Sequence, residues 1–357
     1  MRQLFLEQLA ELAIRYSLCV QSGECVRLSG PVTAAPLLEV LARHVRQAGG
    51  QAVVAMPSVS CAEELERCTD ETVAAVVHVL ADSFGVSPQD AFNSSPHERH
   101  ELLARFWRRV RYRQLRWLAL PFPSTDLAND AGLSLDDWIV VLRAACFLDA
   151  PDPIRRWREQ ADRQARLIDF LQHVRELRLV TPAGTDLRLP VAGRYWLNGH
   201  GQENLPDGEV YSCPLENASV GMVVFDVPTC YAGQPIMGVH LRIDQGRVVD
   251  AHAAQGEEIL YQLLAQDDGA SALGEIGLGC NYAIRRPTCH PLTDEKIGGT
   301  FHLALGMAYP ATGGRNVSAL HWDLVGDLRS GGWIEADGHI ISENGRFLHP
   351  DWPRPWA

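Results

Sequence analysis

The chain begins with alternating helical and strand-like patterns. Residues 25–28 and 51–56 form short apolar runs, which predict strands. Between them, residues 33–48 repeat apolar side chains with the helical period and are followed by two glycines, which often end a helix. A strand, a helix and a second strand in this order predict a βαβ unit and therefore a parallel sheet.

The pattern then becomes helical, and after residue 174 it changes again. Residues 97–120 and 133–174 are expected to be helices, broken by proline pairs at 121/123 and 151/153. Beyond residue 174 short alternating segments and turns predominate, as in β-rich proteins. We therefore expect an α/β domain with a mostly parallel sheet and a helical extension at residues 1–174, and an α+β, β-rich domain at residues 175–357.

Three dipeptides in the second half predict hairpin turns. QG, DG and NG pairs interrupt apolar alternation in IDQGRVV and in GWIEADGHIISENGRF. A helix is expected at residues 257–266.

Composition narrows the classes of partner. The 357 residues are 46% hydrophobic and carry a formal net charge of -12, with a pI near 5.5. An acidic chain argues against nucleic-acid or anionic-membrane partners and leaves a small or polar substrate.

Nine scattered cysteines without a CxxC pair indicate reduced thiols and a cytoplasmic protein. The first 18 residues read as an amphipathic helix rather than a signal sequence, and no apolar run is long enough to span a membrane.

Potential metal ligands gather in residues 273–329. His321 and Asp323 are two positions apart in LHWDL, so in a strand both side chains would lie on one face. His302 lies in the apolar segment GTFHLALG, and Glu295 precedes a Gly-Gly pair, with Asp294 as the turn-forming neighbour.

Two further carboxylates extend this set. Glu275 lies in the apolar segment LGEIGLGCN, where an ionised carboxylate is costly unless it is paired or bound to a metal. Glu209 follows a turn and opens a strand in NLPDGEVYSCP. Together these acidic and imidazole groups exceed what one four-coordinate zinc needs, which favours two metals, a bridging carboxylate and hydrolysis of an amide. Tyr309 could stabilise an oxyanion or donate a proton.

Several segments resemble the aminopeptidase T family of dinuclear metallo-aminopeptidases, of the thermophilic and staphylococcal type. They are NLPDGEV, LGEIGLGCN, DEKIGGTFHLALG, the stretch YPATGGRNVSALHWDLVGDLR and the closing ADGHIISENGRF. The resemblance extends along nearly the whole chain. It implies an N-terminal α/β domain, a β-rich C-terminal domain that holds the metals, and a homodimer. It also implies six metal ligands, namely Glu209, Glu275, Glu295, His302, His321 and Asp323.

The resemblance implies an activity as well. Two divalent cations, zinc, cobalt or manganese, would activate water for hydrolysis of the N-terminal peptide bond of a peptide, with Glu275, Glu295 and Tyr309 as catalytic residues and Glu275 as a candidate bridge. Cys213 and Cys280 depart from the family pattern close to the ligands and leave the substrate preference open. A pathway-specific amide hydrolase would keep the same ligands.

A rival from another class is a mononuclear Fe(II) ring-cleaving dioxygenase. His302, or a histidine in place of Glu275, could join His321 and Asp323 to form its two-histidine, one-carboxylate triad. In the dihydroxypyridine dioxygenase that resembles this family, a histidine replaces the glutamate that corresponds to Glu275. Because Glu209, Glu275 and Glu295 are all present here, hydrolysis is favoured.

Overall fold

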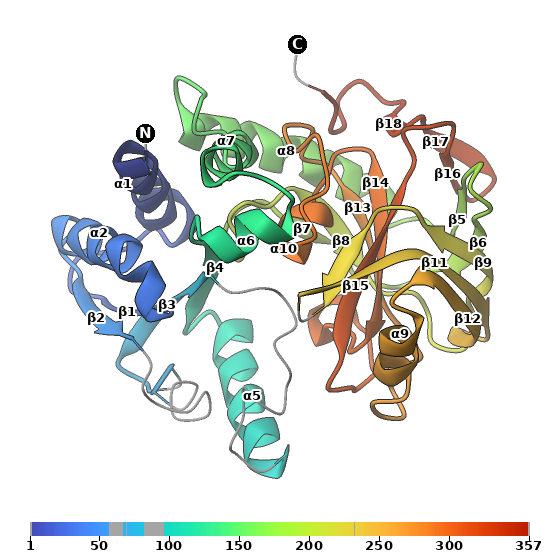
Figure 1. Ribbon diagram of the computed structural model, residues 1–357, viewed down its shortest axis with the longest axis horizontal. Helices are drawn as coiled ribbons and strands as arrows, with labels where there is room; N and C mark the ends of the chain where they lie inside the picture. The colour runs from blue at the N-terminus through green and yellow to red at the C-terminus, as the bar shows by residue number, and fades with distance from the viewer. Residues whose placement is uncertain (1, 57–66, 69, 82–95, 232, 356–357) are drawn as a thin grey trace. The chain divides into compact units, whose positions relative to one another are not determined.

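The computed structural model describes residues 2–56, 67–68, 70–81, 96–231 and 233–355. The chain divides into two compact units (Figure 1). Unit 1 comprises Met1–Trp157 and Gly201–Pro206, and unit 2 comprises Arg158–His200 and Asp207–Ala357. The expected domain boundary at 174/175 lies inside unit 2 and stays a prediction about independent folding. Within the described ranges, no helix combines the length and the apolar character needed to cross a bilayer.

Unit 1 is built on a parallel sheet of four strands in the order β2-β1-β3-β4. The strands are β1 (Cys25–Ser29), β2 (Gln51–Ala55), β3 (Val73–Leu80) and β4 (Arg116–Pro121). The helices are α1 (Arg2–Leu12), continued by the π-helix η1 (Ala13–Ser17), the 3-10 helix η2 (Val32–Ala34), α2 (Ala35–Gln47), α5 (Pro96–Arg111), α6 (Thr125–Asp130) and α7 (Leu135–Ala145). The expected βαβ unit is confirmed, with α2 between β1 and β2.

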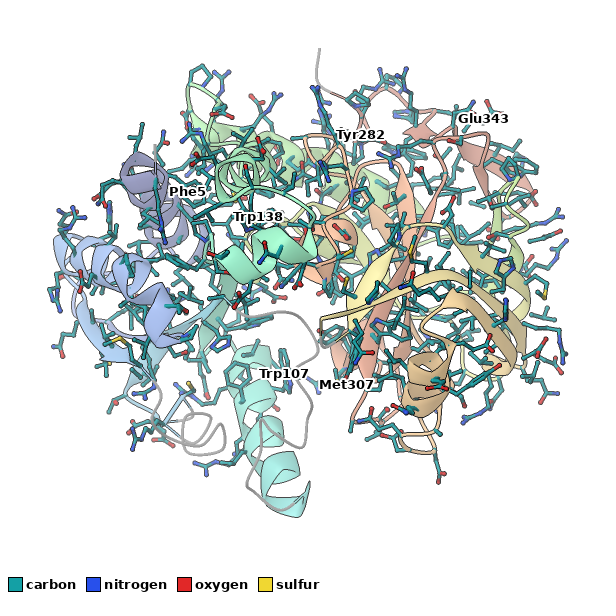
Figure 2. The ribbon with its side chains drawn as sticks, in the orientation of Figure 1. Phe5, Trp107, Trp138, Tyr282, Met307 and Glu343 are labelled. Atoms are coloured by element: carbon teal, nitrogen blue, oxygen red, sulfur yellow. The ribbon has the colours of Figure 1, made fainter. Side chains whose placement is uncertain are left out.

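The core of unit 1 lies between these helices and the sheet. Phe5 of α1 and Trp138 of α7 are almost completely buried (Figure 2). Ser134 caps α7 by accepting a hydrogen bond from the backbone N–H of Asp137, which satisfies one of the free N–H groups at the helix start.

One helix prediction was wrong. Residues 116–120 were expected to continue a helix but form most of β4, which pairs in parallel with β3. Helix α5 ends at Arg111, and Arg113 takes a positive φ of 56°, a left-handed conformation that turns the chain before the strand. The apolar residues RWLALP then add a strand to the sheet.

Unit 2 contains a mainly antiparallel sheet of nine strands in the order β10-β11-β9-β6-β5-β16-β17-β18, with β12 paired to β11. Its strands are β5 (Glu176–Val180), β6 (Asp186–Pro190), β9 (Val220–Phe225), β10 (Thr229–Tyr231), β11 (Gln234–Asp244), β12 (Arg247–Gln255), β16 (Trp333–Ala336), β17 (His339–Glu343) and β18 (Arg346–Phe347). The three predicted hairpin turns are present, because both residues of each turn, Gln245–Gly246, Asp337–Gly338 and Asn344–Gly345, have positive φ, as type I′ turns require. The expected helix is α9 (Glu257–Leu264).

A second antiparallel sheet in unit 2, called sheet C here, carries the candidate ligands. Its order is β15-β14-β13-β8-β7. The strands are β7 (Leu197–Gly199), β8 (Glu209–Ser212), β13 (Leu273–Gly279), β14 (Thr300–Gly306) and β15 (His321–Asp327), and the short helices near them are α10 (Pro291–Asp294) and η3 (Pro310–Thr312). One face of sheet C is apolar and buried, with Ile276, Phe301 and Trp322 in the core. The parallel sheet of unit 1 and the antiparallel sheets of unit 2 confirm the expected fold class.

Helix α8 (Pro153–Leu171) begins in unit 1 and continues into unit 2. Its buried Gln164 lies within hydrogen-bond distance of three oxygens, the backbone carbonyls of Gly199 and Glu209 and the side chain of Asn198. These contacts hold β7 and β8 beside the helix, and one of them is made by the backbone of Glu209, the first candidate ligand along the chain.

Candidate metal centre

The candidate ligands project from the other face of sheet C, where the strand period places them together. Pairing of the strands sets each of five ligands beside a glycine or an alanine of a neighbouring strand. The pairs are Glu209 with Gly279, Glu275 with Ala304, His302 with Gly277, His321 with Gly306, and Asp323 with Ala304. Small neighbours leave room for the ligand side chains: a Cβ on Gly277 would lie 2.0 Å from Nε2 of His302.

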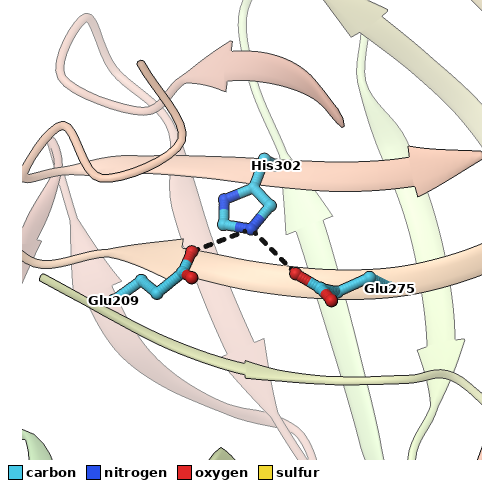
Figure 3. Close-up of side chains that lie close together, drawn as sticks. All are labelled: Glu209, Glu275 and His302. Carbon is cyan, nitrogen blue, oxygen red and sulfur yellow. Dashed lines mark hydrogen bonds and ion pairs between the residues drawn. The ribbon is translucent and has the colours of Figure 1, made fainter. Parts of the chain in front are cut away.

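His302 stands between two glutamates (Figure 3). Its Nε2 lies 3.1 Å from Oε2 of Glu209 and 3.3 Å from Oε1 of Glu275. All three residues are buried, and they come from three adjacent strands, β8, β13 and β14. Residues separated by up to 93 positions thus bring one imidazole and two carboxylates to a single point.

His321 and Asp323 converge as their spacing predicts, with Nε2 of His321 3.5 Å from Oδ2 of Asp323. The Nδ1 atom of His321 lies 2.8 Å from the carbonyl oxygen of Met307. A carbonyl can only accept, so Nδ1 carries a proton, and in the neutral imidazole Nε2 keeps its lone pair. That tautomer is the one in which Nε2 can bind a cation.

Glu295 reaches the same place from outside the strands, directly after α10. It lies in one group with His302 and Asp323, whose ligand atoms are all within 4.8 Å of one another. Its neighbour Asp294 is not in that group and instead accepts hydrogen bonds from the backbone and hydroxyl of Thr288. The sequence-based preference for Glu295 over Asp294 therefore agrees with the geometry.

The six predicted ligands form three overlapping groups. The groups are Glu209 with Glu275 and His302, Glu275 with His321 and Asp323, and Glu295 with His302 and Asp323. Several of their buried atoms have no hydrogen-bond partner, namely Glu209 Oε2, Glu275 Oε2, Asp323 Oδ1 and His302 Nδ1. Unpaired buried carboxylate oxygens are costly, so this donor set fits divalent cations, which would bind them.

Burial and the crowding of carboxylates also shift the pKa values of the proposed ligands. Burial raises the pKa of Glu275, and burial together with the charge of Glu295 raises the pKa of Asp323 well above its usual range. Burial favours neutral His302, but Glu209 and Glu275 outweigh it and raise the His302 pKa well above its usual value. A bound cation would relieve this crowding of carboxylates and would require His302 to be neutral, so cation binding is coupled to release of protons.

Lys296 is a functional candidate that the sequence analysis did not identify. Its side chain is almost completely buried, and its Nζ donates hydrogen bonds to Oε1 of Glu209 at 2.6 Å and to Oε1 of Glu295 at 2.5 Å. Burial tends to raise the pKa of Glu209, but Lys296 and His302 outweigh it and lower that pKa to about 2. A signal was available: Lys296 is the single lysine of a chain that has 31 arginines.

Tyr309 lies beside the group. Its ring centroid is 4.9 Å from that of His321 and 6.1 Å from that of Tyr211. Burial and nearby carboxylates, Glu275 first among them, raise the Tyr309 pKa well above its usual value, so the phenol keeps its proton at neutral pH.

The two cysteines that depart from the family pattern, Cys213 and Cys280, are both buried, and burial raises the pKa of each thiol.

Comparison with known proteins identifies relatives that cover most of the chain. The chain is 28% identical to "Aminopeptidase 2" of Geobacillus stearothermophilus over 85% of this chain and 84% of that protein. Wild-type AmpT from Thermus thermophilus has the same fold, with a TM-score of 0.76 at 24% identity over 98% of this chain and 100% of that structure. The 2,5-dihydroxypyridine dioxygenase of Pseudomonas putida also shares the fold, with a TM-score of 0.65 at 15% identity over 99% and 100% of the two chains.

Both structural likenesses show the fold alone, whereas the family comparison is more specific. The model of the family described as "Thermophilic metalloprotease (M29)" matches residues 61–347, which include every candidate ligand. The chain therefore belongs to the M29 family of thermophilic metalloproteases and is a hydrolase.

Proposed function

We propose that this protein is an aminopeptidase that removes the N-terminal residue of peptides with the help of two divalent cations. The proposed ligands are Glu209, Glu275, Glu295, His302, His321 and Asp323. The observation that carries the proposal is the sharing of residues among the three ligand groups: Glu275, His302 and Asp323 each belong to two of them. Shared ligands are what a two-metal site needs, and Glu275 is our candidate for the bridge. The relatives named aminopeptidases support the choice of substrate.

The cations, when bound, would supply Lewis acidity and lower the pKa of a water molecule. The protein's own residues would do the rest. Glu275 or Glu295 would accept the proton of the attacking water and pass it to the leaving amine. The phenol of Tyr309, which stays protonated, would donate a hydrogen bond to the oxyanion that develops on the scissile carbonyl.

The setting of the activity is also a proposal. We place the protein in the cytoplasm because of its cysteine pattern, and as a homodimer because of the family resemblance. Zinc, cobalt and manganese all suit a site of carboxylates and imidazoles. The acidic chain favours peptide or aminoacyl substrates over nucleic acid or membranes as partners.

A metal count combined with an activity panel tests the proposal. Metal-free protein would be reconstituted separately with zinc, cobalt, manganese and iron, and assayed on aminoacyl and dipeptide substrates. We expect two ions per chain and turnover with at least one of the first three metals. One iron per chain with no peptidase activity would instead support the dioxygenase, and two ions without peptide turnover would support a pathway-specific amide hydrolase.

Two substitutions test the roles. Tyr309→Phe should lower kcat by roughly 10²–10³-fold with unchanged metal content, because it removes one oxyanion donor. Tyr195→Phe is the matched control, since Tyr195 is 62% exposed, and it should leave kcat unchanged. Full peptidase activity in Glu275→Ala with unchanged metal content would contradict the ligand assignment.

A further inference from the structure

Lys296 is a cation that the protein itself supplies to the acidic group. Its side chain is about 1% exposed, so the ammonium has no access to bulk water. Besides its hydrogen bonds to Glu209 and Glu295, its Nζ lies 3.9 Å from Oδ1 of Asp207. One positive charge is thus enclosed by three carboxylates, two of which belong to the proposed ligand set.

The choice of lysine at this position is specific. The chain uses arginine at its 31 other basic positions and buries several of them. Arg109, for example, is buried and donates to the backbone carbonyls of Asp70 and Val73, and Arg194 is buried beside Glu216. Burial of a cation therefore does not by itself call for lysine here. An ammonium is a compact point charge, whereas a guanidinium is a wide planar fork, so the compact group fits a position enclosed by three carboxylates.

The hydrogen bonds of Lys296 leave the ligand oxygens available. The ammonium takes Oε1 of Glu209, while Oε2 of the same carboxylate lies 3.1 Å from Nε2 of His302. In Glu295 it also takes only Oε1. An external cation can therefore bind the remaining oxygens without displacing the ammonium.

We propose that Lys296 is a resident counter-cation of the metal centre: it balances Glu209 and Glu295 in the metal-free protein, stays in place when metal binds, and thereby limits the affinity for metal. This inference rests on the proposed metal centre. Removing one partner of a buried ion pair leaves uncompensated charge and is strongly destabilising. It also removes a positive charge that repels incoming cations. Replacing a residue needed only for packing would not selectively lower the stability of the metal-free protein, and it would not raise the affinity for metal.

The experiment compares wild type with Lys296→Met, Lys296→Arg and the control Arg109→Met, all as full-length protein. Melting is measured with and without Mn²⁺, and Mn²⁺ affinity is measured by titration calorimetry of metal-free protein. For Lys296→Met we expect a melting temperature lowered by roughly 10 °C without metal and by less than half of that with Mn²⁺, and Mn²⁺ binding tighter by on the order of 10- to 100-fold. Lys296→Arg keeps the charge, so its melting should fall in both states without tighter binding.

The control fixes the interpretation. Arg109→Met removes a buried cation of unit 1 that donates hydrogen bonds to Asp70 and Val73 of the same unit, so it should lower melting equally in both states and leave Mn²⁺ affinity unchanged. Unchanged or weaker Mn²⁺ binding by Lys296→Met would overturn the inference. Wild-type protein that binds neither Mn²⁺ nor Zn²⁺ would instead overturn the metal centre itself.

A second variant covers the case in which metal-free Lys296→Met does not fold. Glu295→Gln/Lys296→Met removes both charges of one ion pair and keeps the net charge of the group. If counter-charge is the role of Lys296, this double variant folds without metal. If it also fails to fold, Lys296 is needed for packing and the inference is wrong.

Discussion

At the scale of single residues, burial decides which protonation states the protein tolerates. His290, the N-cap of α10, is buried, and burial lowers its pKa from 6.5 to about 4. Its Nδ1 accepts a hydrogen bond from the backbone N–H of Leu292. The folded protein therefore holds His290 neutral, whereas the unfolded chain protonates it below about pH 6.5.

This difference predicts a pH dependence of stability. The unfolded state binds more protons than the folded state between the two pKa values. The contribution of neutral His290 to the free energy of unfolding is therefore fully present above pH 6.5 and is lost as the pH falls toward 4. His290→Asn keeps a capping oxygen and removes the titration. Between pH 7.5 and pH 5, the free energy of unfolding of wild type should fall by about 2 kcal/mol more than that of the variant, measured by urea denaturation. Equal losses in the two proteins would show that His290 is not held neutral.

Residue types and spacing indicated which of the proposed ligands would lie together, but not the residues that support them. His321 and Asp323 were predictable because strand period alone places them together. The single lysine, Lys296, stands out by composition, but its enclosure was not predictable, because a lysine after two acidic residues is typical of a solvated turn and only the fold buries it. Gln164 was missed for a similar reason: a glutamine on an amphipathic helix gives no sign that it holds the strand of Glu209.

At the scale of elements, the ligand face of sheet C depends on small residues between the ligands. Gly277 of β13 stands opposite His302 of β14, and a Cβ at this position would collide with the imidazole ring. Gly326 of β15 stands opposite Phe301, and there a Cβ would collide with the phenyl ring on the apolar face, 2.3 Å from its nearest carbon. The two glycines make a matched pair of similarly tight sites, 2.0 Å and 2.3 Å, on opposite faces of one sheet.

Gly277→Ala should therefore cost both stability and metal binding. Overpacking costs about 1–3 kcal/mol, and displacement of His302 should weaken metal affinity at least tenfold. Gly326→Ala should cost similar stability but leave metal affinity unchanged, since Phe301 is not a proposed ligand. Chemical denaturation and calorimetric metal titration measure the two effects. Equal metal affinity in both variants would contradict the prediction that a Cβ at position 277 displaces His302.

Secondary structure was predicted correctly where the apolar alternation of the strands and the residue types of the turn agreed, as in the three hairpins. The prediction failed at β4 because the apolar pattern of α5 continues past Arg111 without a glycine or a proline. The left-handed Arg113 ends the helix, and a single arginine gives no such signal in the sequence.

At the scale of the whole molecule, every proposed ligand belongs to unit 2. Metal binding should therefore stabilise unit 2 directly, by mass action on its folded state. Chelation should increase hydrogen exchange in β8, β13, β14 and β15 and leave the parallel sheet of unit 1 unaffected, as measured by mass spectrometry. A uniform increase across β1, β3 and β4 as well would show that the two units unfold together.

The fold class could be predicted at this scale because strand and helix patterns separate along the chain. The clustering of the proposed ligands could not, since Glu209 and Glu275, for example, are brought together by strand order rather than by sequence proximity. Family resemblance supplied what local pattern could not.

The single lysine also gives the protein a chemical handle. An amine-directed acylating reagent finds one side-chain target in the chain, and a lysine-specific protease finds one bond to cut, Lys296–Ile297. Both sites are enclosed by carboxylates, so label or cleavage appears only when the enclosure opens. The rate of either reaction therefore measures how often the structure around Lys296 opens, at one defined position and without an introduced probe.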